Sequence, residues 1–255
     1  MNPLALLLGI GLLPATASTQ AVPVATALPG MAAAVENGPR KLVPFVATYE
    51  VYSDGRRLGN ASMELSRLDD GNWRIDLEMK GSGLMRLAAL DIRQSTVFAS
   101  DGVHYRPLRQ ATSRRTLFSN RERTGVYDWE AGIARWTGDV KRSRRAPIPL
   151  RKGDLDALLI DLAVVRDAVP GRTLGYRNVD GGRAREQVYV VAAETEGIEI
   201  DGIGYEAVKV KRVHGNDQTE VWVAKGVPTP VRILQRENDE DNTDLRLVEY
   251  TGRTQ

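Results

Sequence analysis

Residues 73–80, WRIDLEMK, decide the fold class of this chain. Large apolar side chains alternate with charged ones, which is the pattern of a β-strand with one dry face and one wet face. Residues 45–52 and 60–66 repeat this period of two, and Asp54-Gly55 and residues 69–71 supply hairpin-turn chemistry between the three segments. The sequence therefore predicts three consecutive antiparallel strands in a meander.

Strands are also expected along most of the remaining chain. The segments with strand patterns are residues 90–98, 103–111, 121–129, 133–136, 187–193, 205–213, 220–224, 231–235 and 245–250. Turns are expected at residues 180–182, at residues 215–217 and over the acidic stretch Asn238–Asp244. Strands and helices do not alternate regularly, so a parallel sheet is not expected.

One segment departs from the period of two. Leucine and valine recur at helical spacing from Leu155 to Val169, which predicts a largely buried helix near residues 154–169. Asp154 is the expected N-cap, and Pro170-Gly171 is expected to stop the helix. Arg166 interrupts the apolar surface and is expected to extend its charge toward solvent.

These patterns predict an all-β, mostly antiparallel fold. Residues 44–252 are expected to form a single domain, a large curved sheet or barrel with one packed α-helix. The alternative architecture is an open half-barrel that resembles the periplasmic lipoprotein carriers, whose concave face could hold an acyl chain.

The N-terminal residues predict export. Residues 1–39 contain no Lys or Arg, and an apolar run from Leu4 to Leu13 precedes small residues suited to signal peptidase. We expect residues 1–17 to be a signal peptide, residues 18–43 to be a disordered Ala/Pro linker, and the mature protein to be periplasmic. The alternative for the first residues is a frayed apolar terminus or a membrane anchor. The chain has no Cys, which excludes disulfides and thiolate sites.

Catalytic motifs are sparse. The two histidines, His104 and His214, lie in no recognisable triad, and the Gly-x-Ser-x-Gly elbow is absent from the sequence. Two carboxylate pairs are candidates for glycosidic chemistry, Glu194 with Glu196 beside a predicted turn, and Asp154 with Asp156 at a helix start. Structural roles explain both pairs, and the acidic stretch is expected to be a solvated turn. No catalytic residue, cofactor or metal site is therefore expected.

A basic stretch is the one surface feature that suggests a ligand. Lys141, Arg142, Arg144 and Arg145 form a candidate surface for anionic lipid headgroups or another polyanion. The alternative is a solvated charged face that protects strand edges. Export argues against nucleic acid as the partner, whereas peripheral contact with a membrane remains compatible with these charges.

Several short motifs occur in a familiar order. They are Phe45-x-x-x-Tyr49-x-Val51 with Gly55 and Gly59, Tyr127-Asp128-Trp129, Ile203-Gly204-Tyr205 with Val208-Lys209-Val210, Trp222-Val223-Ala224, and Pro230-Val231-Arg232-Ile233. Together they resemble an exported bacterial family known as domain of unknown function 3108, over about residues 43–250. The resemblance implies a periplasmic, β-rich protein and supplies no catalytic residues.

The sequence thus favours a non-enzymatic protein of the cell envelope that binds an amphipathic ligand, such as a lipid, or an envelope partner. The first alternative is a scaffold that docks on anionic surfaces through its basic flank. The second alternative is a hydrolase that uses carboxylates.

Overall fold

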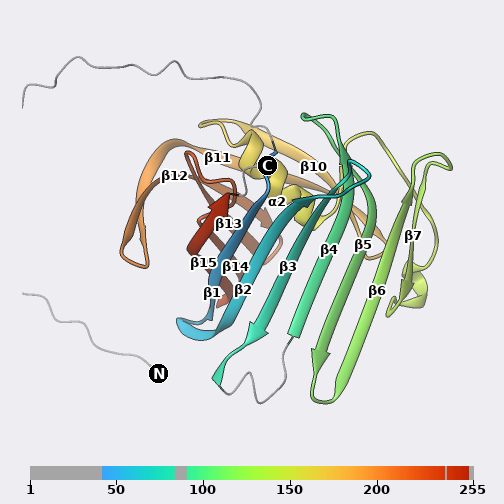
Figure 1. The fold of residues 1–255 in the computed structure, drawn as a ribbon, viewed down its shortest axis with the longest axis horizontal. Helices are drawn as coiled ribbons and strands as arrows, with labels where there is room; N and C mark the ends of the chain where they lie inside the picture. The colour runs from blue at the N-terminus through green and yellow to red at the C-terminus, as the bar shows by residue number, and fades with distance from the viewer. Residues whose placement is uncertain (1–41, 84–90, 239, 253–255) are drawn as a thin grey trace, which may run out of the picture. The chain divides into compact units, whose positions relative to one another are not determined.

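The computed structural model describes residues 42–83, 91–238 and 240–252, all of which belong to one compact unit (Figure 1). The expected signal peptide, residues 1–17, and residues 18–41 of the expected linker lie outside the described residues. Within the described part of the chain, no helix is long and apolar enough to cross a membrane.

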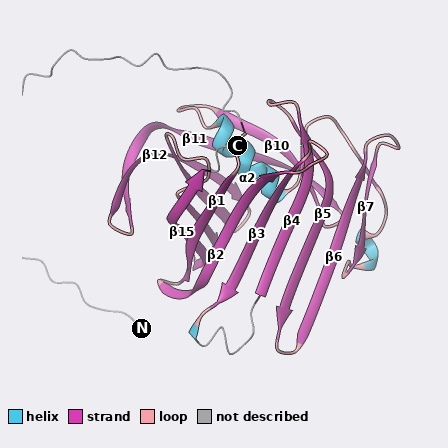
Figure 2. Cartoon of the chain, viewed as in Figure 1, coloured by secondary structure: helices cyan, strands magenta, loops and turns pink. Residues whose placement is uncertain are grey.

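Strands dominate the described residues, as the magenta ribbons of Figure 2 show. The elements are β1 (Phe45–Ser53), β2 (Arg56–Arg67), β3 (Trp73–Gly81), β4 (Asp91–Ser100), β5 (Tyr105–Thr116), β6 (Ser119–Asp128), β7 (Ile133–Gly138), the 3₁₀-helix η1 (Arg142–Arg144), β8 (Ile148–Pro149), β9 (Asp154–Leu155), α2 (Ala157–Asp167), β10 (Thr173–Asp180), β11 (Arg183–Ile200), β12 (Ile203–His214), β13 (Asp217–Ala224), β14 (Arg232–Glu237) and β15 (Glu240–Gly252).

All of the strands in the described part of the chain belong to one 15-stranded sheet in the order β8-β7-β6-β5-β4-β3-β2-β1-β15-β14-β13-β12-β11-β10-β9. The first and last strands pair at its middle, where Phe45 lies opposite Gly252. Among the described pairs, β9 with β10 is parallel and the others are antiparallel. The predicted mostly antiparallel β-fold is confirmed, and the sheet is curved and open.

The edges of the sheet are short and come from neighbouring parts of the chain. β8 and β9 have two residues each, and residues 150–153 connect them. Side chains bring the two ends of the sheet together in place of a backbone ladder. The Tyr127 hydroxyl donates to the Val179 carbonyl at 2.6 Å, and Arg123 contacts Asp180 at 3.1 Å. Short edges offer little backbone for unwanted pairing with another chain.

Helix α2 is packed against the inside of the curved sheet, near its upper end in Figure 1. Its residues Leu158–Ile160 and Leu162–Val165 are buried and join the main core with Tyr49, Ile75 and Phe98. Such burial removes apolar surface from water on every side of the helix, which supplies the main driving force for this packing.

The start of α2 differs from the sequence prediction. The N-cap is Asp156, whose side chain accepts a hydrogen bond from the Leu159 amide at 3.0 Å. Asp154, the predicted N-cap, lies in β9 and pairs with Arg177 at 2.6 Å. A carboxylate two residues earlier cannot reach the free amides of the first turn, because capping requires the residue directly before the helix.

Two strand segments also differ from the prediction. The sequence patterns do not predict β10, although Leu174 and Tyr176 of this strand are buried. Asn238–Asp244 is not wholly a turn, because β15 begins at Glu240 and Asp244 is 2% exposed. The acidic composition of this segment concealed a strand whose charges are paired by arginines of β14 and of β15 itself.

Candidate ligand-binding cavities

Two cavities adjoin Tyr105, the first residue of β5. The apolar cavity has a volume of about 300 Å³ and lies against β1, β2, α2 and residues 226–228. The amphipathic cavity has a volume of about 680 Å³ and lies between the β4–β5 connection, Trp129 and residues 150–153. The larger volume falls in the range of about 300–1,000 Å³ that small-molecule sites occupy.

Both cavities occupy the same end of the sheet because of the strand directions. β1 and β5 begin at this end, whereas β2, β4 and β6 finish there. Loops between strands often carry binding residues, because the rigid sheet fixes the position of each loop. The apolar lining of the smaller cavity is Leu42, Val43, Phe45, Leu65, Leu162 and Val165.

Tyr105 forms part of the wall of each cavity. Its ring packs edge-on against Phe98, with the ring centres 5.5 Å apart, and the Arg166 guanidinium lies 4.6 Å from the ring centre. Arg166 also pairs with Asp167 and donates to the Val103 carbonyl. Its side chain is 13% exposed, so the expectation that it extends into solvent is wrong. The Asp167 carboxylate and the face of the Tyr105 ring stabilise the positive charge of Arg166 in this partly buried position.

The amphipathic cavity combines an aromatic wall with charged groups. Trp129 is held in place because its indole N–H donates to the Pro107 carbonyl at 2.7 Å. Arg106 and Lys152 also line this cavity, and neither side chain forms an ion pair with another described residue. Two cations beside an aromatic and aliphatic surface match the chemistry of an amphipathic anion.

His104 lies at the rim of the amphipathic cavity and does not belong to a catalytic triad. Its ring Nδ1 lies 3.0 Å from the Asp101 carboxylate, and both side chains are exposed. Hydrogen bonds from the backbone and side chain of His104, and from the Val103 amide, lower the pKa of Asp101. These contacts fix the β4–β5 turn, which is the role of an Asx turn.

Two carboxyl groups on and before α2 face the protein interior. Burial raises the pKa of Asp156 to about 7, although hydrogen bonds from Thr96 and the Leu159 amide oppose that shift. Burial raises the pKa of Asp161 to about 7, the Asp156 charge adds to the shift, and Arg212 opposes it. Asp161 forms no hydrogen bond or ion pair with another described residue. Asp156 is fully buried and Asp161 is partly buried, so the protonation of both groups affects the stability of the fold.

The structure divides the basic stretch between exposed and partly buried side chains. Lys141, Arg142 and Arg145 are exposed, whereas Arg144 is partly buried in a separate cavity beside the β10–β11 turn. The short helix η1 makes this separation, because the Arg144 amide donates to the Lys141 carbonyl at 2.8 Å and turns successive side chains in different directions.

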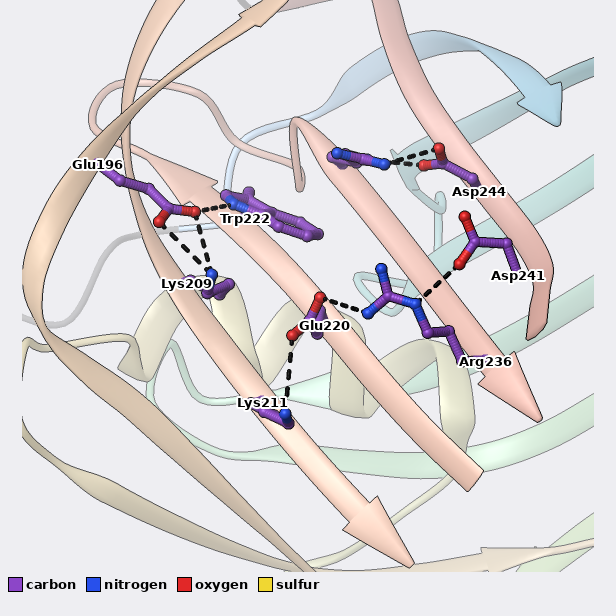
Figure 3. A network of polar contacts seen from close by, with 9 residues as sticks. Glu196, Lys209, Lys211, Glu220, Trp222, Arg236, Asp241 and Asp244 are labelled. Carbon is purple, nitrogen blue, oxygen red and sulfur yellow. Dashed lines mark hydrogen bonds and ion pairs between the residues drawn. The ribbon is translucent and has the colours of Figure 1, made fainter. Parts of the chain in front are cut away.

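The candidate carboxylate pairs do not form catalytic sites. Glu194 and Glu196 lie within β11 and not beside a turn, and Glu196 accepts a hydrogen bond from the Trp222 indole at 2.5 Å. Lys209 lies 3.5 Å from the same carboxylate, as Figure 3 shows. Asp154 and Asp156 have separate partners, Arg177 and the helix N-terminus. A glycosidase needs two carboxyl groups that flank an open substrate site, and neither pair provides one.

Asp241 and Asp244 near the C-terminus belong to a network of paired charges on one face of β12–β15 (Figure 3). Asp244 accepts two hydrogen bonds from Arg232, at 2.8 and 2.9 Å. Arg236 lies between Asp241 and Glu220, at 2.7 and 3.1 Å respectively. Cross-strand pairs of this kind stabilise a sheet face. The network is therefore structural, and the predicted turn accounts only for the start of this segment, because β15 begins at Glu240.

The open antiparallel sheet curved around one helix, with cavities at one end, defines a β-barrel-like protein. The chain belongs to the DUF3108 family, a family of unknown function, because the family model matches residues 48–245. The resemblance drawn from the sequence motifs is therefore confirmed.

A solved structure with a similar fold is the crystal structure of a β-barrel-like protein of the domain of unknown function DUF1849 from Brucella abortus. It is 12% identical in sequence, with a TM-score of 0.57 over 84% of this chain and 99% of that chain. At this identity the similarity concerns the fold. No curated protein matches the chain.

Several residues around the cavities carry no ligand-binding signature in the sequence. Tyr105 and Arg106 have ordinary strand neighbours, and the sequence context of Trp129 is that of a core residue. Lys152 is one basic residue among many in its part of the chain, and its neighbours suggest no site. The sequence offers one weak indication of a site. Tyr105 lies at the start of one strand and Trp129 at the end of the next, so the two residues lie at the same edge of the sheet if these strands are antiparallel neighbours.

Proposed function

We propose that this protein is a non-enzymatic protein of the periplasm that binds an amphipathic anion, such as a fatty acid or lysolipid, in the amphipathic cavity. The observation that carries the proposal is the cavity of about 680 Å³ in which Trp129 and Tyr105 face the same space as Arg106 and Lys152. The aromatic surface would take the acyl chain, and the two cations would take the head group.

The neighbouring apolar cavity supports the same proposal. Leucine, valine and phenylalanine line it, and it shares Tyr105 with the larger cavity. Because Tyr105 lines both spaces, a longer chain that displaced its side chain could extend from one into the other. Burying apolar surface at about 25 cal/mol per Å² makes such an extension favourable.

Binding of cis-parinaric acid, a fluorescent fatty acid, tests this proposal. We expect saturable binding that weakens about tenfold in an Arg106→Gln/Lys152→Gln variant, because the carboxylate loses both cations. Arg142→Gln/Arg145→Gln is the matched control, since it removes the same charge at a distant exposed site, and it should bind as the wild type does. Failure to bind, or equal weakening in both variants, would contradict the proposal.

The β5–β6 turn supports a second function, docking on an anionic bilayer. Leu117 and Phe118 occupy the turn and are 60% and 96% exposed, where Gly, Asn or Asp would be usual. Arg114, Arg115 and Arg121 flank them on the adjoining strands. Apolar side chains surrounded by cations are the combination that inserts into the interface of a charged membrane.

The exposed basic residues extend this surface. Arg121 lies 3.6 Å from Asp139, two residues before Lys141, so the β5–β6 turn and the basic stretch occupy neighbouring positions. Sedimentation with phosphatidylglycerol vesicles tests docking. We expect salt-dependent binding by the wild type and loss of binding in Leu117→Ser/Phe118→Ser. Val188→Ser/Val190→Ser, at two exposed valines of β11, is the control. Binding that is unaffected by the turn variant would refute this function.

A further inference from the structure

The β10–β11 hairpin, Arg123 of β6 and the helix η1 border an open cavity of about 240 Å³ that is distinct from those described above. We call it the arginine-lined cavity. The charged and polar side chains that define it are Arg123, Arg144, Asn178, Asp180, Arg183 and Arg185.

The register of the β10–β11 hairpin explains this gathering. Asn178 lies opposite Arg185 and Asp180 opposite Arg183, so these side chains share one face of the hairpin. Val179 and Ala184 alternate with them and pack into a second apolar cluster, which also contains Tyr127, Ala134, Trp136 and Val140. That packing anchors the hairpin against β6 and η1, and it holds four arginines around one space.

The charges in this cavity are unbalanced. Four guanidinium groups face one carboxylate, and Asp180 is already paired with Arg123 at 3.1 Å. The Nε atoms of Arg123 and Arg144 are buried and have no hydrogen-bond partner in the described structure. Arg183 is exposed, and desolvation together with the nearby charges of Arg144 and Arg185 lowers its pKa. Repulsion of this kind is relieved when an anion occupies the space between the donors.

Two glycines allow the β10–β11 turn to lie close to the arginines of this cavity. Gly181 and Gly182 have positive φ angles of 56° and 73°. A Cβ atom at Gly182 would lie 2.0 Å from the Arg144 carbonyl oxygen, and one at Gly181 would lie 2.8 Å from Arg123 Nη1. The turn therefore lies so close to Arg123 and Arg144 that only glycine fits at these two positions.

We propose that the arginine-lined cavity is a binding site for a phosphomonoester. A phosphate group presents several anionic oxygens to the guanidinium donors, and paired arginines recognise it with bidentate hydrogen bonds. The site is separate from the amphipathic cavity and requires no acyl chain. A free phosphorylated metabolite and the head group of a lipid such as phosphatidic acid share this chemistry.

Calorimetric titration of the full chain with inorganic phosphate at low ionic strength tests the site. We expect one saturable site, weakened at least about tenfold in Arg183→Gln/Arg185→Gln, which removes two exposed arginines without exposing the core. Arg142→Gln/Arg145→Gln removes the same charge from exposed residues of the same surface and should leave phosphate affinity unchanged. An absence of phosphate binding, or equal losses in both variants, would overturn the proposal.

Two further arms separate the sources of the phosphate group. Competition by glycerol 3-phosphate against inorganic phosphate supports a free metabolite. In the Leu117→Ser/Phe118→Ser background, which removes docking through the β5–β6 turn, stronger binding to phosphatidic acid vesicles than to phosphatidylglycerol vesicles, with loss of that difference in Arg183→Gln/Arg185→Gln, supports a lipid head group. If glycerol 3-phosphate does not compete and the double variant binds both kinds of vesicle as the wild type does, the site does not recognise phosphomonoesters.

Discussion

The hydroxyl of Tyr49 lies 2.5 Å from the hydroxyl of Thr229, 180 residues further along the chain, and also donates to the Pro230 carbonyl at 3.0 Å. Both side chains are fully buried. The contact fixes β1, at the middle of the sheet, against the connection between β13 and β14. This connection includes residues 226–228 of the apolar cavity, so the hydrogen bond also supports one wall of that cavity.

Replacement of Tyr49 by Phe should lower the free energy of unfolding by about 1–3 kcal/mol, because two buried oxygen atoms lose their partner. Urea denaturation followed by tryptophan fluorescence measures this change. Tyr52→Phe is the control, since the Tyr52 hydroxyl bonds to Glu50 near the surface. Equal losses in the two variants would show that the buried hydrogen bonds of Tyr49 stabilise the fold no more than the surface hydrogen bond of Tyr52.

Substitution at Gly125 should disrupt the second apolar cluster. A Cβ atom there would lie 2.5 Å from Nε1 of Trp136, which donates to Gln110 at 3.0 Å. We expect Gly125→Ala to destabilise the protein by about 1–3 kcal/mol and to change tryptophan emission. Gly175→Ala, on strand β10 with no atom within 4 Å of the added Cβ, should have little effect. A tolerant Gly125 would indicate that the indole can move aside at no cost.

The raised pKa of Asp161 predicts a pH dependence of stability. Its pKa is about 7 in the folded protein against an ordinary value of 3.8, so the folded state retains a proton that the unfolded chain releases. The contribution is therefore complete below about pH 4 and is lost as pH rises through about 7. The slope is at most about 1.4 kcal/mol per pH unit for one proton.

The variant Asp161→Asn removes this titration. We expect its unfolding free energy to fall less between about pH 4 and about pH 7 than that of the wild type, and to exceed it at neutral pH. Asp217→Asn, at an exposed residue of β13, should leave the wild-type profile unchanged. Parallel profiles for wild type and Asp161→Asn would show that Asp161 titrates alike in the folded and unfolded states.

The paired charges on β14 and β15 give a further prediction. Asp244 is 2% exposed and binds Arg232 and Arg246, so Asp244→Asn would leave two arginines without their shared carboxylate. The expected cost is about 2–4 kcal/mol in the free energy of unfolding, which thermal or chemical denaturation measures. Asp241→Asn, at a more exposed residue with one arginine partner, should cost less. A larger loss in Asp241→Asn would contradict this ranking.

The strands and the helix could be predicted from the sequence because they depend on local periodicity. The alternation in residues 73–80 appears in the structure as Ile75 in the core and Asp76 on the opposite face. The buried helix could be predicted from the spacing of its leucines. β10 was harder to predict, because glycine, asparagine and arginine interrupt its pattern and its burial comes from β11 and α2.

The candidate sites could not be predicted in the same way. Arg144, Arg183 and Arg123 are distant in sequence, and they meet because the two ends of one sheet approach each other. The basic stretch suggested an anion-binding surface, but periodicity does not reveal which of four adjacent cations turns inward. A 3₁₀ turn decides that direction, and its hydrogen bonds depend on the strands on either side.

The sequence by itself determined the β class, the meander of β1–β3, the buried helix and the family, because these follow from residue order over short distances. The tertiary structure alone decided that the sheet stays open, that β1 pairs with β15, and that Tyr105 lies between two cavities. Strand order, closure and cavity walls are set by contacts between residues far apart in the chain. Such contacts form only when apolar burial brings the whole sheet around α2.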